Sequence, residues 1–151
     1  MKKALKTTQE TAEKILKLIG IEAKVTASED LANQAILVQL ETNEPGILIG
    51  YHGETLAAYQ LLLGIVLNKS LKVWTRVIVN VGDYREKREE TLHRMALNAA
   101  QRAHFSGSPV ILPSLSPGER RIIHLALKNN TEVETYSEGE GPERRLVIRP
   151  R

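Results

Sequence analysis

Two glycines interrupt an otherwise apolar segment, GILIGYHGETL, at residues 46–56. Gly50 and Gly53 are separated only by Tyr51 and His52. Because an ordered glycine costs backbone entropy, such a pair is usually placed for a conformational reason. The segment therefore predicts a tight turn, a close packing of helices, or a backbone that a ligand approaches closely.

Hydrophobic periodicity and turn residues predict the elements around this turn. Up to residue 81 we expect helix, strand, strand, short helical turn, helix and strand, over residues 9–19, 21–27, 33–42, 47–49, 54–67 and 72–81. Alternating valines make the last strand the clearest one. The first 81 residues are therefore expected to form a small α+β domain.

A second run of elements begins after Gly82 and Asp83. A long helix is expected from residue 84 to about 105, followed by a short extended piece over 110–115. Ser116 and Pro117 suit the N-cap and the first position of a helix that runs to residue 128. The last elements, in TEVETYSEGEGPERRLVIRP, are two strands around a Gly-Pro turn, a hairpin. We therefore expect two small α/β sandwich-like domains, 1–81 and 82–151.

Composition and charge limit the classes of function. The 151 residues include no cysteine, and no apolar run is long enough to span a bilayer, so we expect a cytoplasmic protein without membrane insertion. The net charge of +3 is unevenly spread, because residues 91–131 are mostly basic and residues 132–143 acidic. This pattern indicates either an anionic partner on the basic side or simply solvated faces.

The glycine turn and its flanking elements resemble the KH domain, a module that binds single-stranded nucleic acid. The order of elements over residues 1–81 is similar to the bacterial, type II form of that domain. In KH modules this loop clamps about four nucleotides. Glycines leave room for the sugar-phosphate backbone, and the free N–H groups of the next helix face phosphate. The resemblance implies RNA contacts by Ile49, Gly50, Tyr51, His52 and Gly53.

The two inner positions of the turn depart from that family, in which they are often basic. Tyr51 and His52 retain stacking and hydrogen-bonding capacity but lose most of the fixed charge, so we expect weak binding by this half alone. From the residues alone, the glycines could instead permit a tight corner between helices. We expect Gly50→Asp with Gly53→Asp to abolish binding at this turn and to leave thermal melting nearly unchanged.

A second candidate site lies in SPGERRIIHLAL, where Arg120 and His124 are four residues apart and share one helix face. A planar guanidinium suits phosphate, and an imidazole can donate to phosphate or stack on a base. Arg121 lies about 100° further round the helix and extends the cationic surface. This segment resembles the R-x-x-x-H domain, a single-stranded nucleic-acid binder, over residues 83–151. The alternative is an ordinary exposed arginine beside a packing histidine.

A KH domain followed directly by an R-x-x-x-H domain resembles the Jag, or SpoIIIJ-associated, family of bacterial RNA-binding proteins. The resemblance implies binding of single-stranded RNA, with DNA left open, and pairing with a second small KH protein. It also implies post-transcriptional regulation linked to cell elongation and envelope growth. The additional N-terminal Jag domain that many members carry is not expected here.

An enzyme is the main competing class. The chain has no G-x-x-x-x-G-K-[ST] phosphate loop and no cluster with metal-ligand spacing. His93 and His104 are lone histidines on the long helix. We therefore expect no catalytic residues, metal ligands or cofactor. Two alternatives stay open: a protein-interaction scaffold with vestigial nucleic-acid sites, and a nucleotide-processing enzyme.

Overall fold

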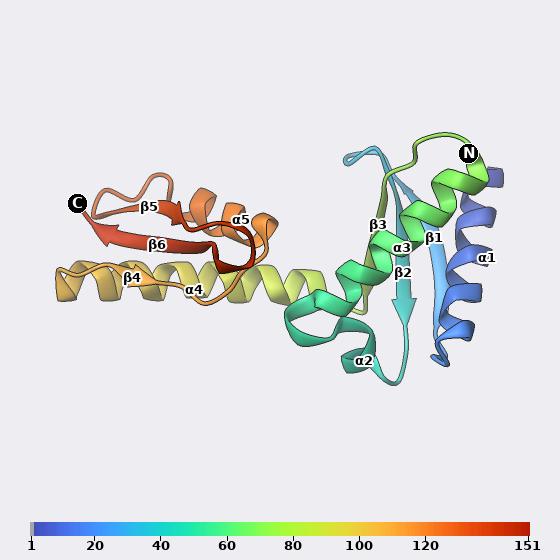
Figure 1. The fold of residues 1–151 in the computed structure, drawn as a ribbon, viewed down its shortest axis with the longest axis horizontal. Helices are drawn as coiled ribbons and strands as arrows, with labels where there is room; N and C mark the ends of the chain where they lie inside the picture. The colour runs from blue at the N-terminus through green and yellow to red at the C-terminus, as the bar shows by residue number, and fades with distance from the viewer. Residues whose placement is uncertain (1) are drawn as a thin grey trace. The chain divides into compact units, whose positions relative to one another are not determined.

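A three-stranded sheet with helices against one face makes up the first unit of the structure, which ends at Arg85 (Figure 1). The structure is a computed structural model and describes residues 2–151. The first two strands form an antiparallel hairpin, and the third pairs with the second in parallel, in the order β1-β2-β3. The strands are β1 (Lys24–Asp30), β2 (Ala35–Glu41) and β3 (Val77–Val81). The helices are α1 (Lys2–Leu18), α2 (Pro45–Ile49) and α3 (Glu54–Leu71), with one 3-10 turn, η1 (Tyr51–Gly53).

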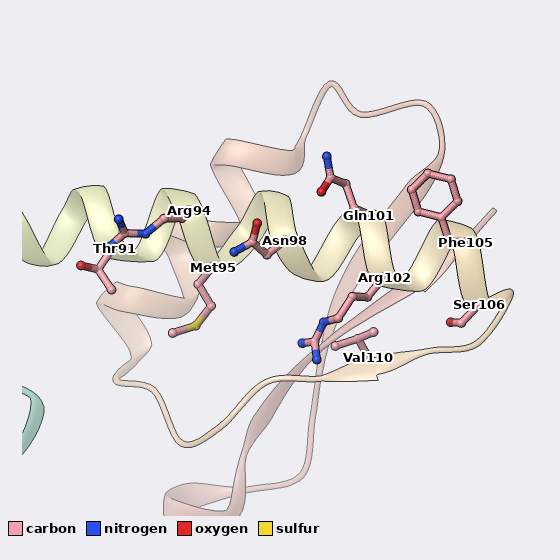
Figure 2. Close-up of a pocket in the computed structure, with 9 residues that line it drawn as sticks. All are labelled: Thr91, Arg94, Met95, Asn98, Gln101, Arg102, Phe105, Ser106 and Val110. Atoms are coloured by element: carbon pink, nitrogen blue, oxygen red, sulfur yellow. The ribbon is translucent and has the colours of Figure 1, made fainter.

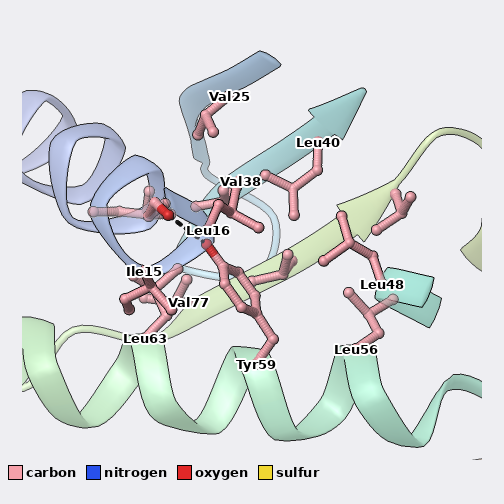
Figure 3. Packing of buried hydrophobic residues seen from close by; sticks show 14 of the residues in the cluster. Ile15, Leu16, Val25, Val38, Leu40, Leu48, Leu56, Tyr59, Leu63 and Val77 are labelled. Atoms are coloured by element: carbon pink, nitrogen blue, oxygen red, sulfur yellow. Dashed lines mark hydrogen bonds between the residues drawn. The ribbon is translucent and has the colours of Figure 1, made fainter. Parts of the chain in front are cut away.

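The core of this unit lies between the helices and one face of the sheet (Figure 3). Val38 and Leu40 on β2 are fully buried and alternate with the half-buried Gln39. Leu63 on α3 packs into the same cluster. Tyr59 lies beside it, and its hydroxyl donates a 2.9 Å hydrogen bond to the carbonyl of Ala12 on α1. This bond joins the two long helices across the core, and burial raises the pKa of Tyr59 above its ordinary value.

Replacing Tyr59 with phenylalanine should lower the free energy of unfolding by about 1 kcal/mol, the net contribution of one such hydrogen bond. The folded protein retains the Tyr59 proton at pH values where the unfolded chain, with a pKa of about 10, releases it. The stability of the wild type should therefore be independent of this group below about pH 10 and fall as the pH rises beyond it. Urea titrations at pH 7 and pH 11 measure both effects. A wild type that is no more sensitive to pH 11 than the phenylalanine variant would contradict this role.

The second unit, from Glu86 onward, contains a three-stranded sheet that is antiparallel throughout, in the order β4-β6-β5. Its strands are β4 (Val110–Ile111), β5 (Val133–Glu138) and β6 (Arg145–Pro150), with a 3-10 turn, η2 (Gly141–Glu143), between the last two. Its helices are α4 (Tyr84–Ser106), of which the first two residues belong to the first unit, and α5 (Pro117–Leu127). Alanines on α4, among them Ala96 and Ala103, pack with Ile123 of α5 and with Leu146 and Ile148 of β6.

The α+β class and the order of elements predicted from the sequence are confirmed in both units. One strand is shorter than predicted, because residues 72–76 are not part of β3. Val73 and Trp74 are 66% and 83% exposed, and the Thr75 N–H donates to the Asn68 side chain at 2.6 Å. The alternating pattern thus continues beyond the residues that have a partner strand. Within residues 2–151, no helix combines the length and apolar character that crossing a membrane requires.

Candidate nucleic-acid interface

The glycine turn joins α2 to α3 through three residues with positive φ. Gly50 has φ 69° and ψ −167°, His52 has φ 50°, and Gly53 has φ 86°. A Cβ at position 50 would lie 2.0 Å from the Thr55 hydroxyl oxygen. A Cβ at position 53 would lie 3.0 Å from the Tyr84 hydroxyl oxygen. Both glycines are therefore required by the fold of the turn itself.

This geometry corrects one expectation from the sequence. Gly50→Asp would force a side chain into the first turn of α3 while keeping a backbone conformation that L-residues rarely adopt. From these contacts we expect the double aspartate variant to melt at a lower temperature than the wild type, where the sequence alone led us to expect nearly unchanged melting. Loss of binding in such a variant could not be separated from damage to the turn.

The turn presents two aromatic rings to solvent. Tyr51 is 71% exposed, and its ring stacks on that of His52 with centroids 4.0 Å apart and planes 20° apart. Ile49 is half-buried and packs against the core of the first unit, so it fixes the base of the turn. The stacked pair offers a flat surface for a base and imidazole nitrogens for hydrogen bonds. It supplies little fixed charge for phosphate.

The second candidate group lies on α5. The Arg120 side chain is half-buried, and its Nη1 donates a 2.6 Å hydrogen bond to the Leu115 carbonyl. His124 is exposed, and its Nδ1 lies 2.6 Å from the Thr135 hydroxyl oxygen on β5. Arg121 is exposed and makes no side-chain hydrogen bond or ion pair with any residue from 2 to 151. The structure therefore holds two of the three side chains in fixed orientations and leaves the third free.

A largely buried ion pair supports the start of α5. Ser116 and Glu119 form a capping box, in which the Ser116 hydroxyl accepts from the Glu119 N–H and the Glu119 carboxylate accepts from the Ser116 N–H. The other Glu119 oxygen accepts a 2.7 Å hydrogen bond from Nε of Arg88 on α4, and the two side chains are only 15% and 14% exposed. This network fixes the first turn of the helix that carries Arg120.

Both halves of the chain match known domain families. Residues 9–81 match the family described as KhpA/KhpB, KH domain, and residues 90–150 match the R-x-x-x-H domain family. The RNA-binding protein KhpB of Clostridium symbiosum is 36% identical over 139 residues, which are 92% of this chain and 63% of that protein. The KhpB of Bacillus subtilis is 32% identical over 136 residues, 89% of this chain and 64% of that protein. The chain carries a KH domain of the KhpA/KhpB type followed by an R-x-x-x-H domain, and it is similar to proteins named RNA-binding protein KhpB.

The chain matches only part of the length of the KhpB proteins. The KhpB of Lactiplantibacillus plantarum is 35% identical over 134 residues, 89% of this chain but 41% of that protein. The chain thus spans less than two thirds of the length of these relatives. The two matched families are the ones that the sequence indicated, and the matched KH domain contains the glycine turn. The resemblance to the Jag family is confirmed.

Arg149, on the exposed face of the second sheet, was not among the site residues predicted from the sequence. Arg149 on β6 pairs with Glu134 on β5, and its guanidinium carbon lies 5.5 Å from the centre of the Tyr136 ring. The β5–β6 register places these side chains together. The alternation of residue types along β5 and β6 could have shown which side chains share a face of the sheet. It could not show that Arg149 lies opposite Glu134, because that register depends on the turn between the two strands. Within the described residues, no group of three or more His, Cys, Asp or Glu could hold a metal ion.

Proposed function

We propose that this chain binds single-stranded RNA along its sugar-phosphate backbone, with two contact regions. The first is the turn formed by Ile49, Gly50, Tyr51, His52 and Gly53. The second is the α5 face formed by Arg120, Arg121 and His124. The observation that carries the proposal is the fixed placement of Arg120 and His124 on one exposed helix face. The relatives named RNA-binding protein KhpB support the choice of RNA.

The α5 face supplies the electrostatic part of binding. The Leu115 carbonyl occupies one donor of the Arg120 guanidinium and leaves the others for phosphate oxygens. Because Thr135 holds Nδ1 of His124, Nε2 remains available to a second phosphate oxygen or a base. Arg121 adds a free cation next to them. Such contacts position the strand without selecting a sequence.

The glycine turn supplies stacking and main-chain contacts. The stacked rings of Tyr51 and His52 offer a surface on which an unpaired base can lie. The Glu54 N–H donates to the Tyr51 carbonyl, and the N–H groups that follow it in the first turn of α3 have no side-chain cap and are offered to phosphate. Since this region lacks an arginine or lysine, we expect it to contribute less affinity than the α5 face.

The proposal assigns residues 1–81 to the KH domain and residues 82–151 to the R-x-x-x-H domain. It includes no catalytic step, and it places the protein in the cytoplasm as a regulator acting on RNA after transcription. Regulation linked to cell elongation and envelope growth is part of the same proposal. Single-stranded DNA is a competitor to be measured against RNA of the same sequence.

Crosslinking to RNA in cells, followed by sequencing of the attached RNA and mass spectrometry of the tryptic peptides, tests this function. Trypsin separates the two regions, because residues 25–69 contain the turn and residues 122–128 contain His124. We expect RNA attached to both peptides. A protein that recovers no RNA above the level of an uncrosslinked control would favour the scaffold alternative. Release of product from a labelled nucleotide would favour an enzyme.

We propose a second small KH protein as a partner, bound to the outer face of α3. This helix is apolar on both sides: Leu63 is buried, whereas Leu61 and Ile65 are 66% and 58% exposed. Leu62 is also 47% exposed, so the outer face forms an apolar surface on the KH domain. The matching family description names both KhpA and KhpB, which supports a KH domain as the occupant.

Replacing Leu61 and Ile65 with glutamate should abolish pairing with a single-KH-domain protein from the same organism, because two charges would be buried in the contact. Sedimentation of the mixed proteins measures the pairing. Lys128→Glu, at an exposed position in the second unit, is the control and should leave pairing intact. Equal pairing by wild type and the double variant would exclude this surface.

A further inference from the structure

An open groove between α4 and β4 combines cationic, amide and aromatic side chains (Figure 2). Arg94, Asn98, Arg102 and Phe105 follow one stripe along α4, and Val110 of β4 closes the other side. None of the residues lining the groove carries a carboxylate. Neither Arg94 nor Arg102 makes a side-chain hydrogen bond or ion pair with another residue in the range 2–151. The groove therefore presents two uncompensated positive charges.

The groove is separate from the α5 face within the same unit. Its lining includes β4, whereas His124 contacts Thr135 on β5. The sheet order β4-β6-β5 places these strands at opposite edges. A stripe of alanines on α4, including Ala99 and Ala103, packs into the core. Met95 and Val110 of the groove pack against this core, whereas Arg94, Asn98, Arg102 and Phe105 are exposed and lie outside it.

We propose that the α4–β4 groove is an additional contact site for single-stranded nucleic acid, an inference that rests on the proposed function. Arg94 and Arg102 bind phosphates, the Asn98 amide bonds to the edge of a base, and Phe105 stacks on a base. The two arginines are eight residues apart, about 12 Å along the helix axis, so they engage different phosphates of one strand.

The aromatic ring favours a single strand over a duplex. Phe105 is 85% exposed at the end of the groove, and its ring can stack only on a base that is already unstacked. The groove thus combines an exposed phenylalanine, two free arginines and an amide along one helix, which are the groups that hold unpaired strands by their phosphates and bases. The α4 stripe would then extend the path of the RNA beyond the α5 face.

Arg94→Ala with Arg102→Ala should weaken binding of a long unstructured RNA about tenfold and make its salt dependence shallower. Phe105→Ala should also weaken binding about tenfold, without changing the salt dependence. The matched control is Lys14→Ala with Lys17→Ala, which removes two charges from exposed positions on α1 and should leave affinity near the wild-type value. Fluorescence anisotropy measures all four proteins, and equal melting temperatures show that they are folded.

Photocrosslinking with 4-thiouridine RNA distinguishes this site from the α5 face. Trypsin releases residues 122–128 with His124, and residues 103–120 with Phe105 at one end and Arg120 of the α5 face at the other. Fragment-ion sequencing of the second peptide therefore has to place the RNA on or next to Phe105, and only such crosslinks count for the groove. We expect RNA on both peptides in the wild type. Crosslinks on 122–128 without any on or next to Phe105, or wild-type affinity in both groove variants, would overturn the groove and leave the proposed function standing. A wild type that binds no RNA would overturn both. Groove variants that lose self-association but bind RNA normally would mark a protein contact instead.

Discussion

Arg120→Ala combined with His124→Ala should lower affinity for single-stranded RNA about 100-fold, since each charge-assisted hydrogen bond to phosphate contributes about 1.5 kcal/mol. Both side chains are oriented by the protein before RNA arrives, through the Leu115 carbonyl and the Thr135 hydroxyl. Little side-chain entropy is then lost on binding, so removing them should have a large effect. The loss should be similar for RNAs of different sequence, because phosphate contacts carry no sequence information.

Anisotropy titrations with several unstructured RNAs measure this effect. Arg144→Ala with His93→Ala is the matched control, because it removes the same residue types from exposed positions outside the proposed contact regions. Arg120→Lys retains the charge without the planar fork and should fall between wild type and the double variant. A loss confined to one RNA sequence would contradict backbone recognition. An unchanged affinity would remove the α5 face from the account.

Glu119→Ala should destabilise the second unit by about 3 kcal/mol, because it leaves the mostly buried Arg88 charge without its partner. The same substitution breaks the capping box at Ser116, which by itself contributes about 1 kcal/mol. One guanidinium nitrogen of Arg88, Nη2, is already buried without a hydrogen-bond partner. Glu119 is therefore the main group that stabilises the Arg88 charge, and its removal should have a large cost.

Hydrogen exchange of the amides in residues 117–127 measures the change, because it reports on α5 separately from the first unit. The double variant Arg88→Met with Glu119→Ala should exchange more slowly than Glu119→Ala alone, since the uncompensated charge is gone. The control Glu134→Ala removes an exposed ion pair with Arg149 and should have a small effect. Similar exchange in Glu119→Ala and Glu134→Ala would show that the buried pair does not stabilise α5.

Local patterns in the sequence were sufficient for the order of elements. Ser116 and Pro117 correctly predicted the start of α5, and the Gly-Pro segment correctly predicted the final hairpin. The start of β3 was misplaced because its pattern extends over Val73 and Trp74, which have no neighbouring strand. Periodicity records which residues suit a strand, whereas pairing depends on where β2 lies.

The candidate site was only partly accessible from the sequence. Spacing placed Arg120 and His124 on one face, but their contacts with Leu115 and Thr135 depend on the packing of α5 against its neighbours. The glycine turn was identified, whereas the close approach of Thr55 to Gly50 required coordinates. The pairing of Arg88 with Glu119 spans 31 residues and has no local signal.

The most direct test of the central claim is the salt dependence of RNA binding by the unmodified chain. A labelled unstructured RNA is titrated with protein at several salt concentrations, and anisotropy gives the association constant at each. Because phosphate contacts release counterions, the logarithm of this constant should fall linearly with the logarithm of salt concentration, with a slope of about −0.7 per phosphate contacted. Anisotropy that stays at its starting value at low ionic strength, even with the protein in large excess, would contradict the account.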